Sequence, residues 1–514
     1  MNKEVRVRFA PSPTGALHIG GVRTALYNYL FAKKNNGKMI LRIEDTDQTR
    51  FVPGAEEYLM ESLEWVGIVP DESPIKGGEY GPYRQSERKN IYAGYAQQLI
   101  DSGHAYYAFD TSEELDAMRE RLKAAKVDSL QYNAITRMQM KNSITLSEDE
   151  VKSRLDSGDP YVIRIKVPRK EEVRLNDMIR GWVMVHSSAM DDKVLMKSDG
   201  MPTYHLANIV DDHLMKITHV IRGEEWLPSA PLHVLLYKYL GWEDTMPQFA
   251  HLPLLLKPDG NGKLSKRDGD KLGFPVFPIT GQFPGKDGAM ENFSGFREAG
   301  YLPDAFLNFL AFLGWNPGTE EEIFSMEGLI EAFTVDRIGK SGTKFDIDKA
   351  KWYNQQYLKT KADADLAKFI KPYLTPEHIQ YDDKKLNAIC AELKERITFP
   401  RDLWNEGQFF FVTPTAYDEQ IVSKKWNEVA VSVLDKFANK ISPDIDADSA
   451  RATLNEVLEA QGVKMGQVMQ ALRLSLTGKG SGPDLMEIIA ILGSEETKKR
   501  IKNAIEKLPV KMEN

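Results

Sequence analysis

Residues 11–26 read PSPTGALHIGGVRTAL and stand between a predicted strand and a predicted helix. Before them, Val5, Val7 and Phe9 alternate with two arginines, a pattern that predicts a strand with one buried face. After them, an apolar stripe that ends at Leu30 predicts a helix. The two prolines and the glycine between these elements favour a turn. The stretch therefore predicts a strand, a short loop and a helix in succession.

His18 lies where the predicted helix begins, and Gly20 and Gly21 fall in its first turn. Glycine lets a ligand approach the backbone closely, and the N–H groups of a helix start attract phosphate. We therefore predict that His18 donates a hydrogen bond to a phosphate oxygen, with an ordinary loop histidine as the alternative. The loop matches neither of the common nucleotide-binding patterns, GxGxxG and GxxxxGK[ST].

Length and composition exclude several classes of protein. The 514 residues suggest three or more domains. No apolar run of about 18 residues is present and the N-terminus has no apolar signal region, so we expect no membrane span and a cytoplasmic location. Cys390 is the only cysteine, which excludes an internal disulfide and a cysteine-based zinc cage. A formal net charge of −8 argues against nonspecific coating of nucleic acid but allows a focused basic face.

A second motif, KLSKR at 263–267, lies between two glycine-rich stretches. Lysines on a mobile glycine loop can neutralise phosphate charge as it develops, although the pentamer alone is also typical of a solvated surface loop. Together, HIGG and KLSKR resemble the HIGH and KMSKS signatures of class I aminoacyl-tRNA synthetases. Longer blocks resemble the bacterial glutamyl-tRNA synthetase family: 8–21, LRIEDTD at 41–47, 202–227, KLSKRDG at 263–269, 300–315 and, more weakly, 471–485.

The resemblance implies a glutamate–tRNA ligase that uses ATP. Glutamate attacks the α-phosphate of ATP to give glutamyl-adenylate, and the 2′-hydroxyl of the terminal tRNA adenosine then takes the glutamyl group. Such chemistry relies on positioning and charge neutralisation more than on a protein nucleophile. Mg²⁺ is expected to arrive with ATP rather than in a protein cage. The resemblance assigns ATP binding to His18, Gly20, Gly21, Lys263, Ser265 and Lys266, with His18, Lys263 and Lys266 as catalytic residues and Lys266 as the one of largest effect.

The two motifs depart from the class signatures, although a glycine at position 21 is normal for the family that the chain resembles. Gly21 stands where many class members have a second histidine, while Leu264 and Arg267 replace the Met and the final Ser of KMSKS. Neither change affects the lysines. Many bacterial members carry a cysteine/histidine zinc site where this chain reads AYYAFD at 105–110, so no zinc is predicted.

Glutamate carries one ammonium and two carboxylates, so its pocket needs opposite charges. Glu44 follows the predicted strand 39–43 and can hold the ammonium, while arginines can hold carboxylates by two-point contacts. Glutamine lacks the charge of glutamate, so a buried arginine would lose its partner if glutamine bound. Each residue alone would be typical of a surface ion pair. The resemblance assigns the glutamate site to Arg8, Ser12, Glu44, Tyr204, Asn208 and Arg222.

Asp211 and Asp212 are adjacent acidic residues that could suggest a metal site. Neighbouring residues on one element point in different directions, which argues against a shared ion. We therefore predict that they cap a helix or contact the tRNA end.

The resemblance also predicts the domain organisation and an α/β fold class. A Rossmann-like catalytic domain (1–107 and 201–245) is interrupted by an acceptor-binding insertion (108–200), then followed by a stem-contact domain with the KLSKR loop (246–345) and an all-α anticodon-binding region (346–514). Arg473, with Lys479, is predicted to meet anticodon bases or phosphates of the tRNA. The family is usually monomeric.

Residues 271–297 are rich in Gly, Pro and Phe and lengthen the loop after KLSKR. They predict either plain surface elaboration or a lid or tRNA contact.

Other functions remain open from the sequence. An enzyme of the same fold could charge glutamine tRNA as well as glutamate tRNA. A shortened paralogue that modifies a tRNA base, a small-molecule nucleotidyltransferase and a noncatalytic RNA-binding protein are further alternatives. The full helical C-terminal region and the intact His18, Lys263 and Lys266 argue against these three.

Overall fold

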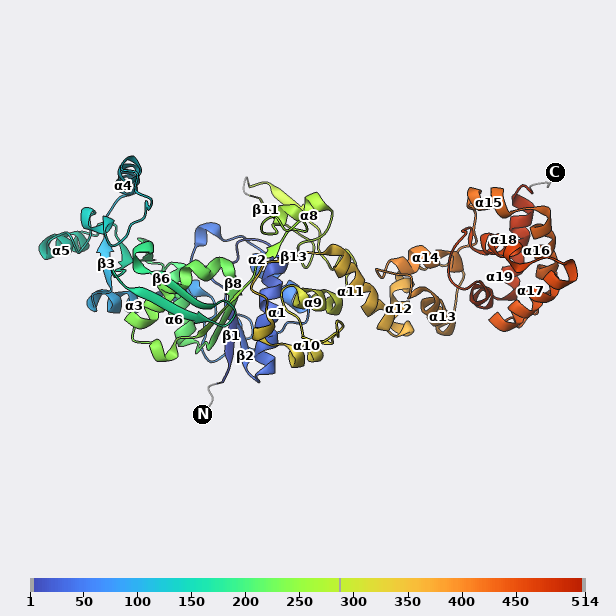
Figure 1. Cartoon of the computed structure of the whole chain (residues 1–514), viewed down its shortest axis with the longest axis horizontal. Coiled ribbons are helices and arrows are strands. Elements are labelled where there is room, and N and C mark those ends of the chain that lie inside the picture. Colours follow the sequence, from blue (N-terminus) through green and yellow to red (C-terminus); the bar gives the residue numbers. More distant parts are fainter. Residues whose placement is uncertain (1–3, 286–287, 511–514) are drawn as a thin grey trace. The chain divides into compact units, whose positions relative to one another are not determined.

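The computed structural model describes residues 4–285 and 288–510, with the backbone alone for residues 266, 267 and 270. The chain folds into two compact units. The first comprises the residues up to Ala299 together with Phe306–Ile347, and the second comprises Gly300–Ala305 and the residues from Asp348 on. Figure 1 draws both units and labels many of their helices and strands. Among the described residues, no helix combines the length and the apolar character needed to cross a bilayer.

The first unit is built on a six-stranded sheet of order β2-β1-β8-β9-β5-β6. Its strands pair in parallel except for β5 and β6, which form an antiparallel hairpin at one edge. Helix α1 (Ile19–Lys34) packs on β1, β2 and β8, and α7 (Ala230–Tyr239) packs on β5. In such sheets, ligands bind at the carboxyl ends of the parallel strands. The strands are β1 (Arg6–Phe9), β2 (Lys38–Leu41), β5 (Glu172–Asp177), β6 (Gly181–His186), β8 (His219–Gly223) and β9 (Gln248–Leu252).

Other elements of this unit surround the sheet or extend from it. Their bounds are α2 (Ala55–Trp65), α3 (Lys89–Asp101), α6 (Tyr204–Leu214), β10 (Leu255–Leu256), α8 (Lys266–Leu272), α10 (Met326–Ala332) and β13 (Thr343–Lys344). Helix α9 (Pro303–Phe312) includes the point where the chain returns from the second unit to the first.

Strand β1 is buried on both faces, so the prediction of a single buried face is wrong. Arg6 and Arg8 are each only 3% exposed. A strand inside a parallel sheet is covered on both sides, and its charges are tolerated only when paired. Arg6 lies 2.8 Å from Glu72, and Arg8 lies 3.2 Å from Asp212.

The predicted insertion at 108–200 contributes to two different sheets. Its hairpin β5–β6 belongs to the central sheet, whereas the predicted boundaries placed these residues outside the catalytic domain. The alternating burial of β5 would fit either sheet, so the sequence pattern could not place it. The separate three-stranded sheet contains β3 (Ala105–Ala108), β4 (Val162–Ile165) and β7 (Val194–Met196), with α4 (Ser112–Ala124) and α5 (Glu148–Asp156) nearby in sequence.

The stretch 271–297, expected to be a long loop, contains an antiparallel hairpin of β11 (Gly281–Pro284) and β12 (Met290–Phe293). Tyr58 of α2 meets the rings of Phe283 and Phe293 edge-on, with centroids 5.4 and 5.8 Å apart. Phe293 also lies 4.0 Å from Phe277. Phe277, Phe283 and Phe293 therefore form an aromatic cluster with Tyr58 of α2.

The second unit confirms the prediction of an all-α C-terminal region. All regular elements among its described residues from Asp348 on are helical, and residues such as Ile389, Trp426 and Leu434 form its buried core. Helix α19 is interrupted at Gly493, where φ is 78°. The helices are α11 (Ile347–Thr360), α12 (Asp363–Ile370), α13 (Asp383–Leu393), α14 (Asp402–Phe411), α15 (Glu419–Lys425), α16 (Glu428–Lys440), α17 (Ala447–Gln461), α18 (Met465–Thr477) and α19 (Leu485–Lys507).

Candidate active site

A cavity of about 390 Å³ opens at the carboxyl ends of β1 and β8. Parallel strands end at the same edge of a sheet, so residues far apart in the sequence meet there. β1 and β8 each supply an arginine, α6 supplies a tyrosine and an asparagine, and the loops after β1 and β2 supply a serine and a glutamate. The cavity thus gathers the whole predicted glutamate set: Arg8, Ser12, Glu44, Tyr204, Asn208 and Arg222.

Glu44 is a buried anionic group of this cavity and is 8% exposed. Its Oε1 accepts hydrogen bonds from Arg42 at 2.8 Å and from Asn208 at 3.1 Å. Arg42 was not among the predicted site residues, although it is the one charged residue inside the strand-like stretch 39–43. Its fully buried guanidinium orients the carboxylate of Glu44 from behind.

Asp211 and Asp212 are buried ion-pair partners, so the prediction of caps or tRNA contacts is wrong. Both side chains are at most 1% exposed. Asp211 accepts from Arg88 at 2.7 Å, whereas Asp212 accepts from Arg8 at 3.2 Å and from Arg42 at 2.8 Å. Burial opposes ionisation of Asp212, but the two guanidiniums lower its pKa. This carboxylate therefore neutralises charge beneath the cavity.

Replacing Asp212 with asparagine is expected to lower the free energy of unfolding of the first unit by about 3–5 kcal/mol, because it leaves two buried guanidiniums without this anion. Urea unfolding followed by tryptophan fluorescence measures the change. The exposed Asp128→Asn provides a control that should not change the stability. A loss below about 1 kcal/mol, typical of surface pairs, would contradict the stabilising role.

Arg222 is a buried cationic group of the cavity and is 4% exposed. It donates to Tyr204 Oη at 2.7 Å and to His251 Nε2 at 3.0 Å, with His233 Nδ1 3.4 Å away. Burial and the nearby Arg222 charge keep the pKa of His233 well below its usual range. Among the described residues, no carboxylate lies within ion-pair distance of Arg222. A buried cation with only neutral partners attracts the carboxylate of a ligand.

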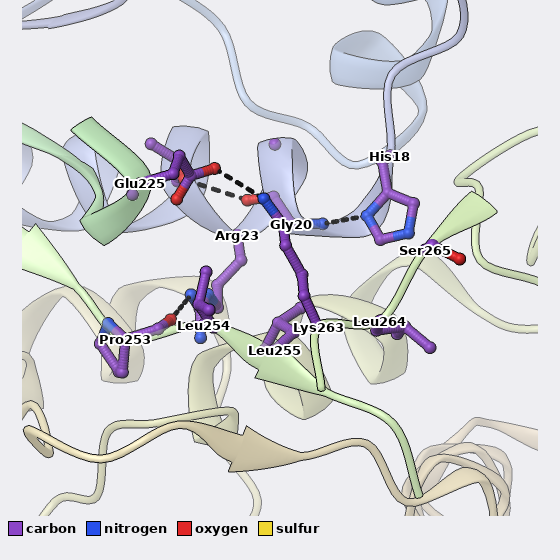
Figure 2. A pocket seen from close by; sticks show the side chains of 13 residues that line it. His18, Gly20, Arg23, Glu225, Pro253, Leu254, Leu255, Lys263, Leu264 and Ser265 are labelled. Carbon is purple, nitrogen blue, oxygen red and sulfur yellow. Dashed lines mark hydrogen bonds and ion pairs between the residues drawn. The ribbon is translucent and has the colours of Figure 1, made fainter. Parts of the chain in front are cut away.

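A second cavity, of about 400 Å³, shares Gly20, Gly21 and Glu225 with the first. His18 is the N-cap of α1, and its Nδ1 accepts the Gly20 N–H at 3.2 Å, as Figure 2 shows. In a neutral imidazole the proton then sits on Nε2, which becomes a donor. The cavity also has an apolar wall, suited to a flat ring, formed by Leu254, Leu255 and Leu264.

The KLSKR motif reaches this cavity through Lys263 and Ser265. Lys263 Nζ lies 3.0 Å from Glu225 Oε1, a contact drawn in Figure 2. Lys266 is the first residue of helix α8 rather than part of an extended loop. Its side chain is outside the described residues, so its catalytic role stays a prediction.

Arg473 lies on α18 in the second unit and is half-buried. One of its guanidinium nitrogens donates to the carbonyl of Pro483 at 2.7 Å. The predicted contact of Arg473 with tRNA stays a prediction.

Comparisons with known proteins agree over the whole chain. The family described as tRNA synthetases class I (E and Q), catalytic domain, matches residues 4–275 and 286–352, and the anticodon binding domain family matches 365–505. The residues between the first two matched pieces fall inside the stretch 271–297 that departs from the family pattern.

Individual relatives are similar along almost their full length. The chain is 66% identical to a glutamate–tRNA ligase of Cytophaga hutchinsonii over 507 residues, with 98% of each chain covered. It is 58% identical to one of Amoebophilus asiaticus over 508 residues, again with 98% of each covered. The solved glutamate tRNA ligase from Elizabethkingia meningosepticum, in complex with its amino acid, shares 52% identity at a TM-score of 0.93 and covers 99% of this chain and 100% of its own. The chain therefore belongs to the class I tRNA synthetases of the glutamate and glutamine type, and within them to the glutamate–tRNA ligases.

Proposed function

We propose that this chain activates L-glutamate with ATP as glutamyl-adenylate and transfers the glutamyl group to the 3′ end of tRNA(Glu). The observation that carries the proposal is the charge arrangement of the first cavity. Arg222 offers a buried positive charge without a carboxylate partner among the described residues, and Glu44 lines the same cavity with a negative charge. This arrangement suits a ligand that carries an ammonium and carboxylates.

Glutamate binds in this cavity with its ammonium at Glu44 and its side-chain carboxylate at Arg222. Tyr204, Asn208, Ser12 and Arg8 complete the polar lining. The α-carboxylate then faces the wall that the two cavities share around Gly20 and Gly21. Glutamine has the same shape without the charge, so its binding would leave the buried guanidinium without an anion.

ATP binds in the second cavity, with its phosphates at the start of α1. His18 Nε2–H and the backbone N–H groups of the first turn donate to phosphate oxygens. A glutamate α-carboxylate oxygen bonds to the α-phosphorus as the bond to the bridging oxygen breaks, and pyrophosphate leaves. Lys263 and Lys266 neutralise the negative charge of the leaving pyrophosphate. To do so, Lys263 gives up its ion pair with Glu225 and pairs with a phosphate oxygen instead. Mg²⁺ accompanies ATP and supplies further charge neutralisation.

In the second step, the 2′-hydroxyl of the terminal adenosine attacks the glutamyl carbonyl and AMP leaves. Arg473 and Lys479 of the helical unit contact the anticodon arm of the tRNA. The choice between tRNA(Glu) alone and tRNA(Glu) with tRNA(Gln) depends on such anticodon contacts.

Charging of purified tRNA(Glu) and tRNA(Gln), each with labelled glutamate, tests the proposal, alongside ATP–pyrophosphate exchange with and without tRNA. We expect charging of tRNA(Glu). Charging of both tRNAs would identify a nondiscriminating enzyme, whose product on tRNA(Gln) requires a later amidation. Absence of both charging and exchange would contradict the proposed function.

A further inference from the structure

Arg222 is held by buried polar groups that have no part in the proposed chemistry. Arg222 on β8 lies directly opposite His251 on β9, and its Nε donates to His251 Nε2 at 3.0 Å. On the other side of the ring, His251 Nδ1 lies 2.6 Å from Asp177 Oδ2, at the end of β5. His251 is 0% exposed and Asp177 is 2% exposed. The three residues form a continuous chain from a carboxylate through an imidazole to a guanidinium.

The direction of each hydrogen bond in this chain is determined by its chemistry. A guanidinium can only donate, so His251 Nε2 accepts and the ring proton sits on Nδ1, where it is donated to Asp177. Burial lowers the pKa of His251 despite the opposing effect of Asp177. Burial opposes ionisation of Asp177, but hydrogen bonds from His251 and the backbone lower its pKa. The imidazole is therefore neutral between an anion and a cation.

The two ends of the chain are held in place by further contacts. Asp177 Oδ1 accepts the backbone N–H groups of Ile179 at 2.9 Å, Arg180 at 2.8 Å and His251 at 3.4 Å, which leaves Oδ2 for the His251 ring. The ring of Phe249 is stacked with that of His251, at 10° and 6.2 Å, and the Arg222 guanidinium lies 5.6 Å from the Phe249 centroid.

We propose that Asp177 and His251 are positioning residues that make Arg222 specific for a carboxylate ligand. They hold Arg222 through its Nε. The imidazole of His251 separates the carboxylate of Asp177 from the guanidinium. A carboxylate in direct contact, as Asp212 is with Arg8, would occupy the guanidinium and compete with the ligand. The neutral ring orients Arg222 while its charge stays available to the cavity. This inference rests on the proposed role of Arg222 in glutamate binding.

Asp177→Asn tests the inference by reversing the hydrogen bonds. The three backbone N–H groups that donate to Oδ1 hold the amide oxygen, so the amide NH₂ faces His251 Nδ1. The ring proton must then move to Nε2, where Nε2–H meets the Nε–H of Arg222. We expect the glutamate KM in pyrophosphate exchange to rise about 10- to 100-fold, the size of effect that outer-shell partners of metal-ligating histidines have, with the ATP KM almost unchanged. An unchanged glutamate KM would overturn the inference.

A double-mutant cycle with His251→Leu separates positioning from general support. Leucine has neither a donor nor an acceptor, so residue 177 can no longer act on Arg222 through a side chain at position 251. In that background we expect Asp177→Asn to change the glutamate KM by less than about 3-fold, since coupled residues are not additive. The same fold-change in both backgrounds would overturn the inference. Asp192→Asn, which alters a buried aspartate of the three-stranded-sheet region, is the matched control and should not change the glutamate KM.

A measurement on the unaltered protein covers the case in which Asp177→Asn does not fold. ¹⁵N NMR of labelled histidines, with His251 assigned by its loss in His251→Leu, reports which ring nitrogen carries the proton. We expect the Nδ1–H form, and an Nε2–H form would overturn the inference. Failure of the proposed function is recognised separately, since the unaltered protein would then charge no tRNA with glutamate.

Discussion

Replacing Lys266 with alanine is expected to slow ATP–pyrophosphate exchange by about 10²- to 10³-fold, the usual effect of removing one group that stabilises charge in the transition state. Negative charge builds on pyrophosphate as it leaves, and a lysine ammonium at this point acts on the transition state more than on bound ATP. The affinity for tRNA should change little, because the loss concerns the adenylation step. Exchange kinetics and filter binding of tRNA measure the two quantities.

A matched control lies on the same helix. Lys271 is exposed in the last turn of α8, and Lys271→Ala removes the same charge at the other end of that helix. Exchange should stay close to that of the unaltered protein. Equal losses of exchange and of tRNA affinity in Lys266→Ala would show that the lysine supports tRNA binding or folding instead.

Four of the cavity residues that the sequence did predict lie inside a family motif close to the end of a parallel strand: Arg8, Ser12, Glu44 and Arg222. Arg8 and Arg222 lie near the ends of β1 and β8, and Glu44 follows β2. The parallel topology brings such positions to one edge of the sheet, so residues from separate motifs meet there. Their grouping in one cavity therefore follows once the parallel order of the strands is known.

Asp177 and His251 could not be predicted in this way. Their contact requires β5 to lie beside β9, and the alternating pattern of β5 does not show which sheet it joins. For the same reason, the sequence pattern does not show that Arg8 and Asp212 form an ion pair. The partner that allows Arg8 to be buried lies roughly two hundred positions away in the sequence. Local periodicity carries no information about such a distant contact.

Arg222→Gln is expected to lower kcat/KM for glutamate by about 10²- to 10³-fold, equivalent to about 3–4 kcal/mol. The substitution keeps a polar side chain but removes the buried positive charge, so the side-chain carboxylate of glutamate loses a charge-assisted, two-point partner. The ATP KM should change little, because Arg222 lines the first cavity and not the second. Pyrophosphate exchange at varied glutamate and at varied ATP separates the two effects.

Arg174→Gln is the matched control for this prediction. Arg174 lies on β5 of the same sheet, where its side chain is 59% exposed and pairs with Glu172. It should leave both KM values unchanged, since exposed pairs contribute little and the residue lines neither cavity. An unchanged glutamate dependence in Arg222→Gln would remove Arg222 from the glutamate site and assign the carboxylate to Arg8. A parallel rise in the KM of ATP would instead indicate that Arg222 supports the wall between the cavities, because only a loss confined to glutamate is explained by the missing charge.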